Sequence, residues 1–169
     1  MVRENVFAPD AKDFSACLEL LGYRTIALGF NSADFTSQNR QRQFIVGCPD
    51  ERIAAAFQRA LLDTADDIGI NSPCSEEKKV LAACLTAHPC RMAAEDNYCF
   101  ESEIKRLRIL SPEECERLQG FPVDWTAGFS SNRRRIMLGN AVTVPIIKWI
   151  AERIKETINE SNENRTDGL

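Results

Sequence analysis

Hydrophobic residues recur at helical spacing in three stretches of the chain, and each stretch is bounded by residues that favour a helix end. The first predicted helix covers residues 12–21 and ends at Gly22. The second covers residues 51–63, and the third begins near Pro145. The apolar stripe of the third consists of Ile147, Ile150, Ala151, Ile154 and Ile158. Residues 159–169 are polar, so we expect a disordered tail there.

Two shorter apolar runs predict strands at residues 23–30 and 43–47, separated by a polar loop. Helix, strand, loop and strand in this order are typical of the second half of an α/β unit. Turn-forming residues interrupt the pattern between 64 and 106, where we expect a short helix around 75–85 and a strand near Tyr98. Clear helical signals return at Ser111, where Ser-Pro-Glu-Glu forms a capping box for a helix that ends at Gly120.

The composition narrows the class of protein. No apolar run reaches the roughly 18 residues that a membrane span needs, and Glu4 and Asp10 interrupt any signal-peptide pattern. The seven cysteines are irregularly spaced, which favours reduced thiols in a cytoplasmic protein. A net charge of −4 disfavours a free-standing DNA binder. Local basic clusters such as Arg133-Arg134-Arg135 fit either solvated surface or phosphate contact.

Four short motifs carry more specific information. Glu4-Asn5-Val6 lies near the N-terminus, and Gln38-Asn-Arg-Gln-Arg42 leads into an apolar strand. The segment Ser111–Pro122 combines the capped helix with a Phe-Pro pair, and Gly139-Asn-Ala-Val142 precedes the last helix. In this order the motifs resemble the later conserved blocks of the cytosine-C5 DNA methyltransferases.

The resemblance covers about residues 3–47 and 107–154. It implies an α/β fold: the C-terminal part of a Rossmann-like methyltransferase domain with an incomplete sheet, plus a short target-recognition region. The implied regions are residues 1–47 as part of the catalytic domain, 48–106 as the short variable target-recognition region, 107–158 as the late blocks with a C-terminal helix that returns to the catalytic domain, and 159–169 as the disordered tail.

The resemblance also assigns roles to individual residues. Such enzymes flip the target cytosine from the duplex and add a cysteine thiolate to C6, which activates C5 toward the methyl group of S-adenosylmethionine. The matching positions imply that Glu4 binds the cytosine N3 and amino group, Arg42 contacts O2, and Arg40 supports the site or the DNA backbone. Gln38 joins both arginines in the DNA-contacting segment, although Ser37 replaces the proline usual in the family. The residues matched to the S-adenosylmethionine pocket are Asn140, Ala141 and Val142.

Two family blocks have no match in the 169 residues: the Phe-x-Gly-x-Gly turn that holds S-adenosylmethionine and the Pro-Cys-Gln block that supplies the nucleophile. Pro73-Cys74 and Pro89-Cys90 lie in the variable region without a following glutamine, so we expect neither thiol to be the nucleophile. Cysteines 74, 84, 90 and 99 could form a zinc site with His88, but no Cys-x2-Cys pair is present. We therefore expect packed thiols and no metal.

These motifs predict the C-terminal portion or subunit of a DNA (cytosine-5-)-methyltransferase that is inactive alone. Its expected partners are double-stranded DNA and a complementary N-terminal methyltransferase chain. The run Phe44–Val46 and the isoleucines 147, 150 and 154 should then form an open apolar face for that chain. The alternatives are a non-catalytic DNA-binding or regulatory partner and a decayed fragment without function.

Overall fold

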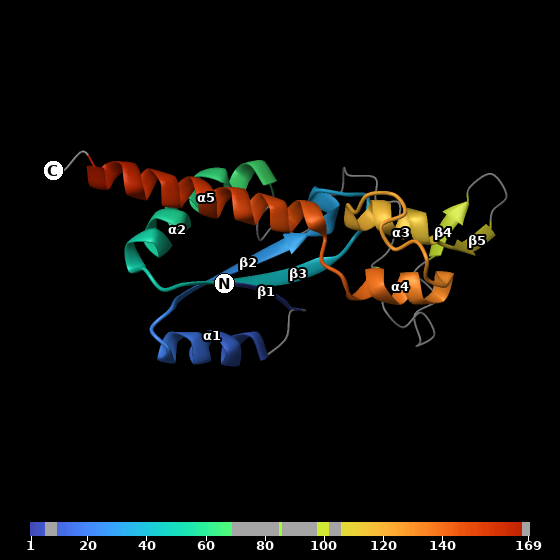
Figure 1. Cartoon of the computed structure of the whole chain (residues 1–169), viewed down its shortest axis with the longest axis horizontal. Coiled ribbons are helices and arrows are strands. Elements are labelled where there is room, and N and C mark those ends of the chain that lie inside the picture. The colour runs from blue at the N-terminus through green and yellow to red at the C-terminus, as the bar shows by residue number, and fades with distance from the viewer. Residues whose placement is uncertain (6–9, 69–84, 86–97, 102–105, 167–169) are drawn as a thin grey trace. The chain divides into compact units, whose positions relative to one another are not determined.

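The computed structural model describes residues 1–5, 10–68, 85, 98–101 and 106–166 (Figure 1). Contacts divide the chain into two compact units, each assembled from segments that are far apart in the sequence. The first unit consists of Met1–Phe30, Gln41–Pro73 and Lys148–Leu169, and the second of Asn31–Arg40 and Cys74–Ile147. The expected roles of residues 1–47 and 107–158 in the catalytic domain, and of residues 48–106 in target recognition, stay predictions.

The first unit is built on a three-stranded sheet with helices on both sides. Its strands are β1 (Val2–Asn5), β2 (Arg24–Asn31) and β3 (Gln41–Cys48). Its helices are α1 (Asp10–Leu20), α2 (Glu51–Ile68) and the part of α5 (Val144–Thr166) that starts at Lys148. The strand order is β1-β3-β2, and β1 runs antiparallel to β3 with Glu4 opposite Phe44. Within this unit α1 lies on one side of the sheet, and α2 and α5 lie on the other (Figure 1). The helices and strands expected in this part of the sequence are therefore confirmed.

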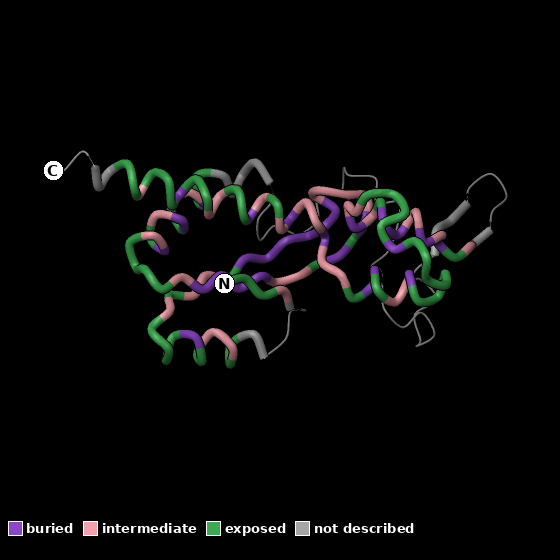
Figure 2. The backbone as a smooth tube through the Cα atoms, in the orientation of Figure 1, coloured by how far each residue is buried: buried purple, intermediate pink, exposed green. Residues whose placement is uncertain are grey.

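Alternation along β3 explains how both sides of this sheet are buried. Ile45 packs with Leu18 of α1 on one side. On the other side the ring of Phe44 meets that of Phe30 edge-on at 5.7 Å between centroids. Phe30 in turn meets Trp149 of α5 at 5.6 Å. In Figure 2 residues 28–31 of β2 and 44–47 of β3 are accordingly coloured as buried.

The expectation of an open apolar face is wrong for most of the residues named for it. Every residue from Phe44 to Val46 is at most 4% exposed, and Ile150 is 1% exposed, because the chain's own helices cover the sheet. The buried side of α5 also differs from the expected stripe: Ala151 and Ile158 are exposed, whereas Thr157 is buried.

The expectation of a disordered tail is wrong for residues 159–166, which continue helix α5 as far as Thr166. Residues 167–169 lie outside the described part of the chain. A long helix can extend past its packed part because each added residue gains a backbone hydrogen bond. None of the helices in the described ranges is both long and apolar enough to span a membrane.

The second unit combines a short hairpin with two helices. Its elements are the 3₁₀ helix η1 (Ser32–Asp34), the antiparallel strands β4 (Tyr98–Glu101) and β5 (Arg106–Ile109), and the helices α3 (Pro112–Gln119) and α4 (Ser131–Asn140). Its buried core consists of Leu85, Leu110, Cys115 and Leu138. The strand expected near Tyr98 is confirmed, and the helix expected around 75–85 falls outside the described residues except for Leu85.

Helix α3 has the boundaries that its local sequence predicts. The Ser111 hydroxyl accepts the N–H of Glu114 at 3.2 Å, and the Glu114 carboxylate accepts the N–H of Ser111 at 2.7 Å. The helix ends at Gly120, which has a φ of 77°. A Cβ at this glycine would lie 2.5 Å from the Cδ of Pro145, so both conformation and space require glycine.

Helix α4 was not expected, because its sequence has no apolar stripe. Its buried residues are Arg134, Leu138 and Gly139. The three consecutive arginines have three different environments. Arg134 is buried, Arg135 donates its Nε–H to the carbonyl oxygen of Leu110 at 2.9 Å, and only Arg133 is exposed. Neither solvated surface nor phosphate contact therefore describes the whole cluster.

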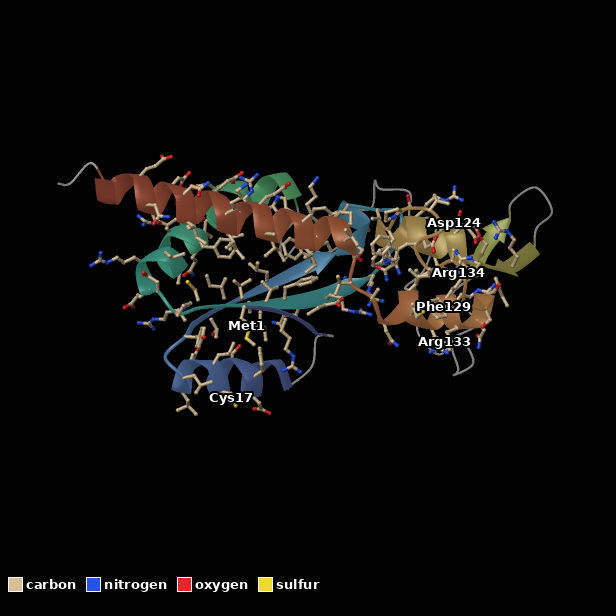
Figure 3. All side chains as sticks on the ribbon, viewed as in Figure 1. Met1, Cys17, Asp124, Phe129, Arg133 and Arg134 are labelled. Atoms are coloured by element: carbon tan, nitrogen blue, oxygen red, sulfur yellow. The ribbon has the colours of Figure 1, made fainter. Side chains whose placement is uncertain are left out.

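A buried carboxylate organises the loop between α3 and α4. Glu116 is 0% exposed and accepts the backbone N–H of Asp124 at 2.7 Å and that of Thr126 at 2.8 Å. Arg134, which is labelled in Figure 3, donates to the same carboxylate at 2.9 Å. Burial would raise the pKa of Glu116, but hydrogen bonds from Thr126 and Arg134 outweigh it and lower the pKa to about 2. The loop is thus anchored by a carboxylate that is ionised at neutral pH.

Glu116→Ala should lower the free energy of unfolding by about 3 kcal/mol, since it removes one carboxylate from the buried Arg134 guanidinium and the acceptor of two backbone N–H groups. Urea unfolding of the variant and the wild type measures the difference. Glu113→Ala is the matched control, because Glu113 contacts the same arginine from a more exposed position and should cost much less. Equal losses in the two variants would contradict the anchoring role of Glu116.

The stability of the chain should fall between about pH 4.5 and pH 2 through Glu114. Hydrogen bonds from Arg108 lower the pKa of Glu114 from 4.5 to about 2, so the unfolded chain takes up its proton first as the pH falls. The stabilisation is complete above pH 4.5 and disappears toward pH 2. Glu114→Gln keeps the capping geometry but should lower the free energy of unfolding by about 1 kcal/mol at pH 7. The stability of this variant should also fall less between pH 4.5 and pH 2. Urea unfolding across this pH range tests the prediction, and identical pH profiles would contradict it.

Candidate functional site

The structure brings together Glu4 and Arg42, the two residues that the motifs place at the reacting base. Glu4 lies opposite Phe44 in the β1–β3 ladder, and Arg42 lies two residues before Phe44 on the same face of β3. The Nε of Arg42 is 3.5 Å from Oε1 of Glu4. The side chains are 16% and 14% exposed, respectively, so the ion pair is mostly enclosed but remains accessible.

A carboxyl group beside a guanidinium forms a useful pair of contacts for a polar heterocycle. The carboxyl can donate or accept a proton at a ring nitrogen, and the guanidinium can stabilise negative charge on a neighbouring carbonyl oxygen. The backbone supports the arginine as well, because its Nη1 donates to the carbonyl oxygen of Gln41 at 2.7 Å. This arrangement suits a ring on which charge develops during reaction.

Gln38 lies in the second unit and has a buried side chain with unused hydrogen-bonding capacity. It is 0% exposed, and within the described residues neither polar atom of its amide has a hydrogen-bond partner. The loop around it is held by Asn31, whose Oδ1 accepts the N–H groups of Ala33 at 3.1 Å and Arg40 at 3.0 Å. A buried amide without such partners is an exception in folded proteins.

Arg40 is 4% exposed, and its guanidinium donates to backbone carbonyl oxygens of the second unit. It is therefore part of the protein interior in this structure. Its expected contact with the DNA backbone stays a prediction.

The residues matched to the S-adenosylmethionine pocket lie at the C-terminal end of α4. Asn140 is the last residue of the helix and is exposed, and Ala141 caps it. Ala141 and Val142 are half-buried. Their turn is held by the buried residues Gln119 and Thr143, which sequence reasoning missed. The signal available was a glutamine placed directly before the helix-terminating glycine, which alone is not specific.

The thiols of the described residues differ in exposure. Cys17 is exposed, Cys48 is half-buried and Cys115 is buried. Burial raises the pKa of Cys115 to about 11, so this thiol stays protonated at neutral pH and is a poor nucleophile. Cys74, Cys90 and His88 lie outside the described residues. Elsewhere, in the ranges that the structure describes, no group of His, Cys, Asp and Glu side chains is arranged to hold a metal ion.

A match to a family model supports the resemblance that the motifs Ser111–Pro122 and Gly139-Asn-Ala-Val142 carry. The model for C-5 cytosine-specific DNA methylase matches residues 63–156, which is more than half of the chain. This range includes α3, α4 and the first half of α5. Glu4 and Arg42 precede it.

Curated relatives match the chain over a limited stretch. The Type II methyltransferase M.Sau3AI of Staphylococcus aureus is 41% identical over 56 residues, which are 33% of this chain and 14% of that protein. The Type II methyltransferase M.SsoII of Shigella sonnei is 42% identical over 52 residues, which are 31% of this chain and 14% of that protein. The chain therefore covers far less than two thirds of the length of either relative.

Solved structures extend the likeness to nearly the whole chain. The Dnmt2 methyltransferase of S. pombe has a TM-score of 0.65 and 16% sequence identity, over 94% of this chain and 66% of that chain. At this identity the likeness concerns the fold. It confirms the expected α/β class with a small, incomplete sheet.

Proposed function

Because the chain belongs to the C-5 cytosine-specific DNA methylase family, we propose that it forms the C-terminal portion of a DNA (cytosine-5-)-methyltransferase. The complete enzyme transfers a methyl group from S-adenosylmethionine to C5 of a cytosine flipped from duplex DNA. The ion pair of Glu4 and Arg42 is the observation that supports this proposal most strongly.

Glu4 and Arg42 are suited to stabilise the charge that develops on the cytosine ring during the reaction. Cytosine C5 is a weak nucleophile, and addition of a thiolate to C6 activates it while negative charge develops near N3 and O2. The Glu4 carboxyl hydrogen-bonds N3 and the amino group, and the Arg42 guanidinium stabilises charge at O2. Both side chains are largely enclosed, so water screens these interactions only weakly.

Residues at the end of α4 fit one wall of a site for S-adenosylmethionine. Asn140 offers an exposed amide to a polar ligand, and the half-buried Ala141 and Val142 offer small apolar surfaces beside it. When bound, S-adenosylmethionine supplies an electrophilic methyl group. The remaining walls and the nucleophilic thiol come from the Phe-x-Gly-x-Gly and Pro-Cys-Gln segments of a complementary N-terminal methyltransferase chain.

Complementation tests this function. The 169-residue chain is mixed with an N-terminal methyltransferase segment that carries both blocks, labelled S-adenosylmethionine and duplex DNA. Label should reach cytosine C5 only when both polypeptides are present. An N-terminal segment with serine in place of the Pro-Cys-Gln cysteine is the matched control and should give none.

Two outcomes would contradict the proposal. Methyl transfer by the chain without the added segment would mean that one of its own cysteines is the nucleophile. DNA binding by a folded pair of polypeptides, without any methyl transfer, would favour a non-catalytic DNA-binding or regulatory partner.

A further inference from the structure

The guanidinium of Arg40 joins three backbone carbonyls that lie far from it in the sequence. Its Nη1 donates to the carbonyl oxygen of Leu85 at 2.8 Å and to that of Gly139 at 3.3 Å. Its Nη2 donates to the carbonyl oxygen of Gly139 at 3.3 Å and to that of Ala141 at 3.0 Å. Arg40 is 4% exposed, so these contacts are nearly free of competition from water.

Two of these carbonyls lie where a cation is most effective. Gly139 is in the last turn of α4, and Ala141 is its C-terminal cap. The last carbonyls of a helix lack partners within the helix and carry partial negative charge. A planar guanidinium can reach several of them at once, because its donors point outward at fixed angles. Arg40 thus closes the end of α4 from a separate segment of the chain.

Other buried side chains hold the same turn. Gln119 Nε2 donates to the carbonyl oxygen of Leu138 at 3.0 Å, and the Thr143 hydroxyl donates to Gln119 Oε1 at 2.9 Å. The hydroxyls of Ser32 and Thr143 are 2.6 Å apart, and the Ser32 N–H donates to the carbonyl oxygen of Arg40 at 2.9 Å. Arg40 is therefore one member of a connected polar network around the end of α4.

We propose that Arg40 is a positioning residue for the wall that binds S-adenosylmethionine, and that it does not contact a DNA phosphate. By fixing the carbonyls of Gly139 and Ala141, it sets the position of Asn140 between them. This inference rests on the proposed function, which assigns Asn140–Val142 to that wall. To reach a phosphate, the guanidinium would have to give up its buried hydrogen bonds to these carbonyl oxygens, which is unfavourable.

The first test uses the 169-residue chain alone and requires neither DNA nor activity. Arg40→Lys keeps the charge but removes the planar group, and Arg40→Met removes both. Backbone amides of residues 139–143 should exchange hydrogen at least about tenfold faster in both variants, while amides of α3 keep their protection. Arg24→Lys is the matched control, because Arg24 is an exposed arginine of β2, and it should change neither region.

Two results of the exchange experiment would overturn the proposal. Unchanged exchange at residues 139–143 would show that Arg40 does not fix this turn. Protection lost throughout the second unit in Arg40→Lys would show that Arg40 is needed to fold the unit and not to position one turn.

The second test uses the complemented enzyme and separates the two roles of Arg40. A positioning role predicts that Arg40→Lys raises the KM for S-adenosylmethionine by about tenfold with little change in kcat, because preorganisation of the wall is lost. The dependence of DNA affinity on salt should stay unchanged. A phosphate contact would instead reduce the slope of log affinity against log salt by about one, which would overturn the proposal. If the wild-type chain and the N-terminal segment together are inactive, the proposed function fails. The exchange experiment still decides the role of Arg40.

Discussion

Glu4→Gln is expected to slow methyl transfer by the complemented enzyme by at least about a hundredfold, because a glutamine cannot share a proton with N3 as charge develops on the ring. The amide keeps the size of the carboxyl group and one hydrogen-bond acceptor, so binding of DNA should change little. The loss should therefore fall on the chemical step, where the interaction is strongest. Single-turnover rates with labelled S-adenosylmethionine, compared with DNA affinity under the same conditions, measure the two effects.

Glu19→Gln is the control for this change. Glu19 is an exposed acid of α1 in the same unit, where it accepts a hydrogen bond from Thr25 at 2.8 Å. The control removes one negative charge without touching the ion pair of β1 and β3, and should keep the wild-type rate. A near-normal rate for Glu4→Gln would show that Glu4-Asn5-Val6 is not the catalytic block.

Arg42→Ala should slow the chemical step by on the order of a hundredfold, as expected when one donor to a developing oxyanion is removed from an enclosed site. Arg42→Lys should restore part of the rate, because it returns a positive charge without the planar group. Arg24→Ala, in an exposed arginine of the neighbouring strand, is the matched control. Single-turnover rates test the order of the three variants.

DNA affinity distinguishes a catalytic Arg42 from a phosphate contact. Loss of a phosphate contact weakens DNA binding and reduces its salt dependence, whatever the rate of the chemical step. We expect Arg42→Ala to retain most of its DNA affinity. A large loss of affinity with an unchanged single-turnover rate would contradict the role at O2.

Local sequence predicts those parts of the fold that depend on neighbouring residues. The capping box of Ser111 and Glu114 and the stop at Gly120 are encoded within ten residues of one another, and the structure has them as expected. Helix α4 could not be predicted in this way. The hydrogen bond between Arg134 and Glu116 joins two different helices, so the run of arginines gave no sign that one of them is buried.

In the candidate site, too, local sequence predicts some features, whereas tertiary packing sets others. The motifs suggest Glu4 and Arg42 as site residues, and the pairing of β1 with β3 brings their side chains to 3.5 Å. The motif that contains Arg40 gave no sign that its guanidinium binds carbonyls of Leu85, Gly139 and Ala141, because those partners are set by tertiary packing. For the same reason the apolar strand from Phe44 to Val46 could not be recognised as covered by the chain's own helices.

A double-mutant cycle of Glu4 and Arg42 tests most directly whether the two residues act on one reacting base. Single-turnover methyl transfer is measured for the wild type, Glu4→Gln, Arg42→Ala and the double variant in the complemented enzyme. If both side chains stabilise the same developing charge, the double variant should lose much less than the product of the two single losses, with a coupling of at least about tenfold. Two single losses that multiply without coupling, or a Glu4→Gln variant with normal turnover, would contradict the account.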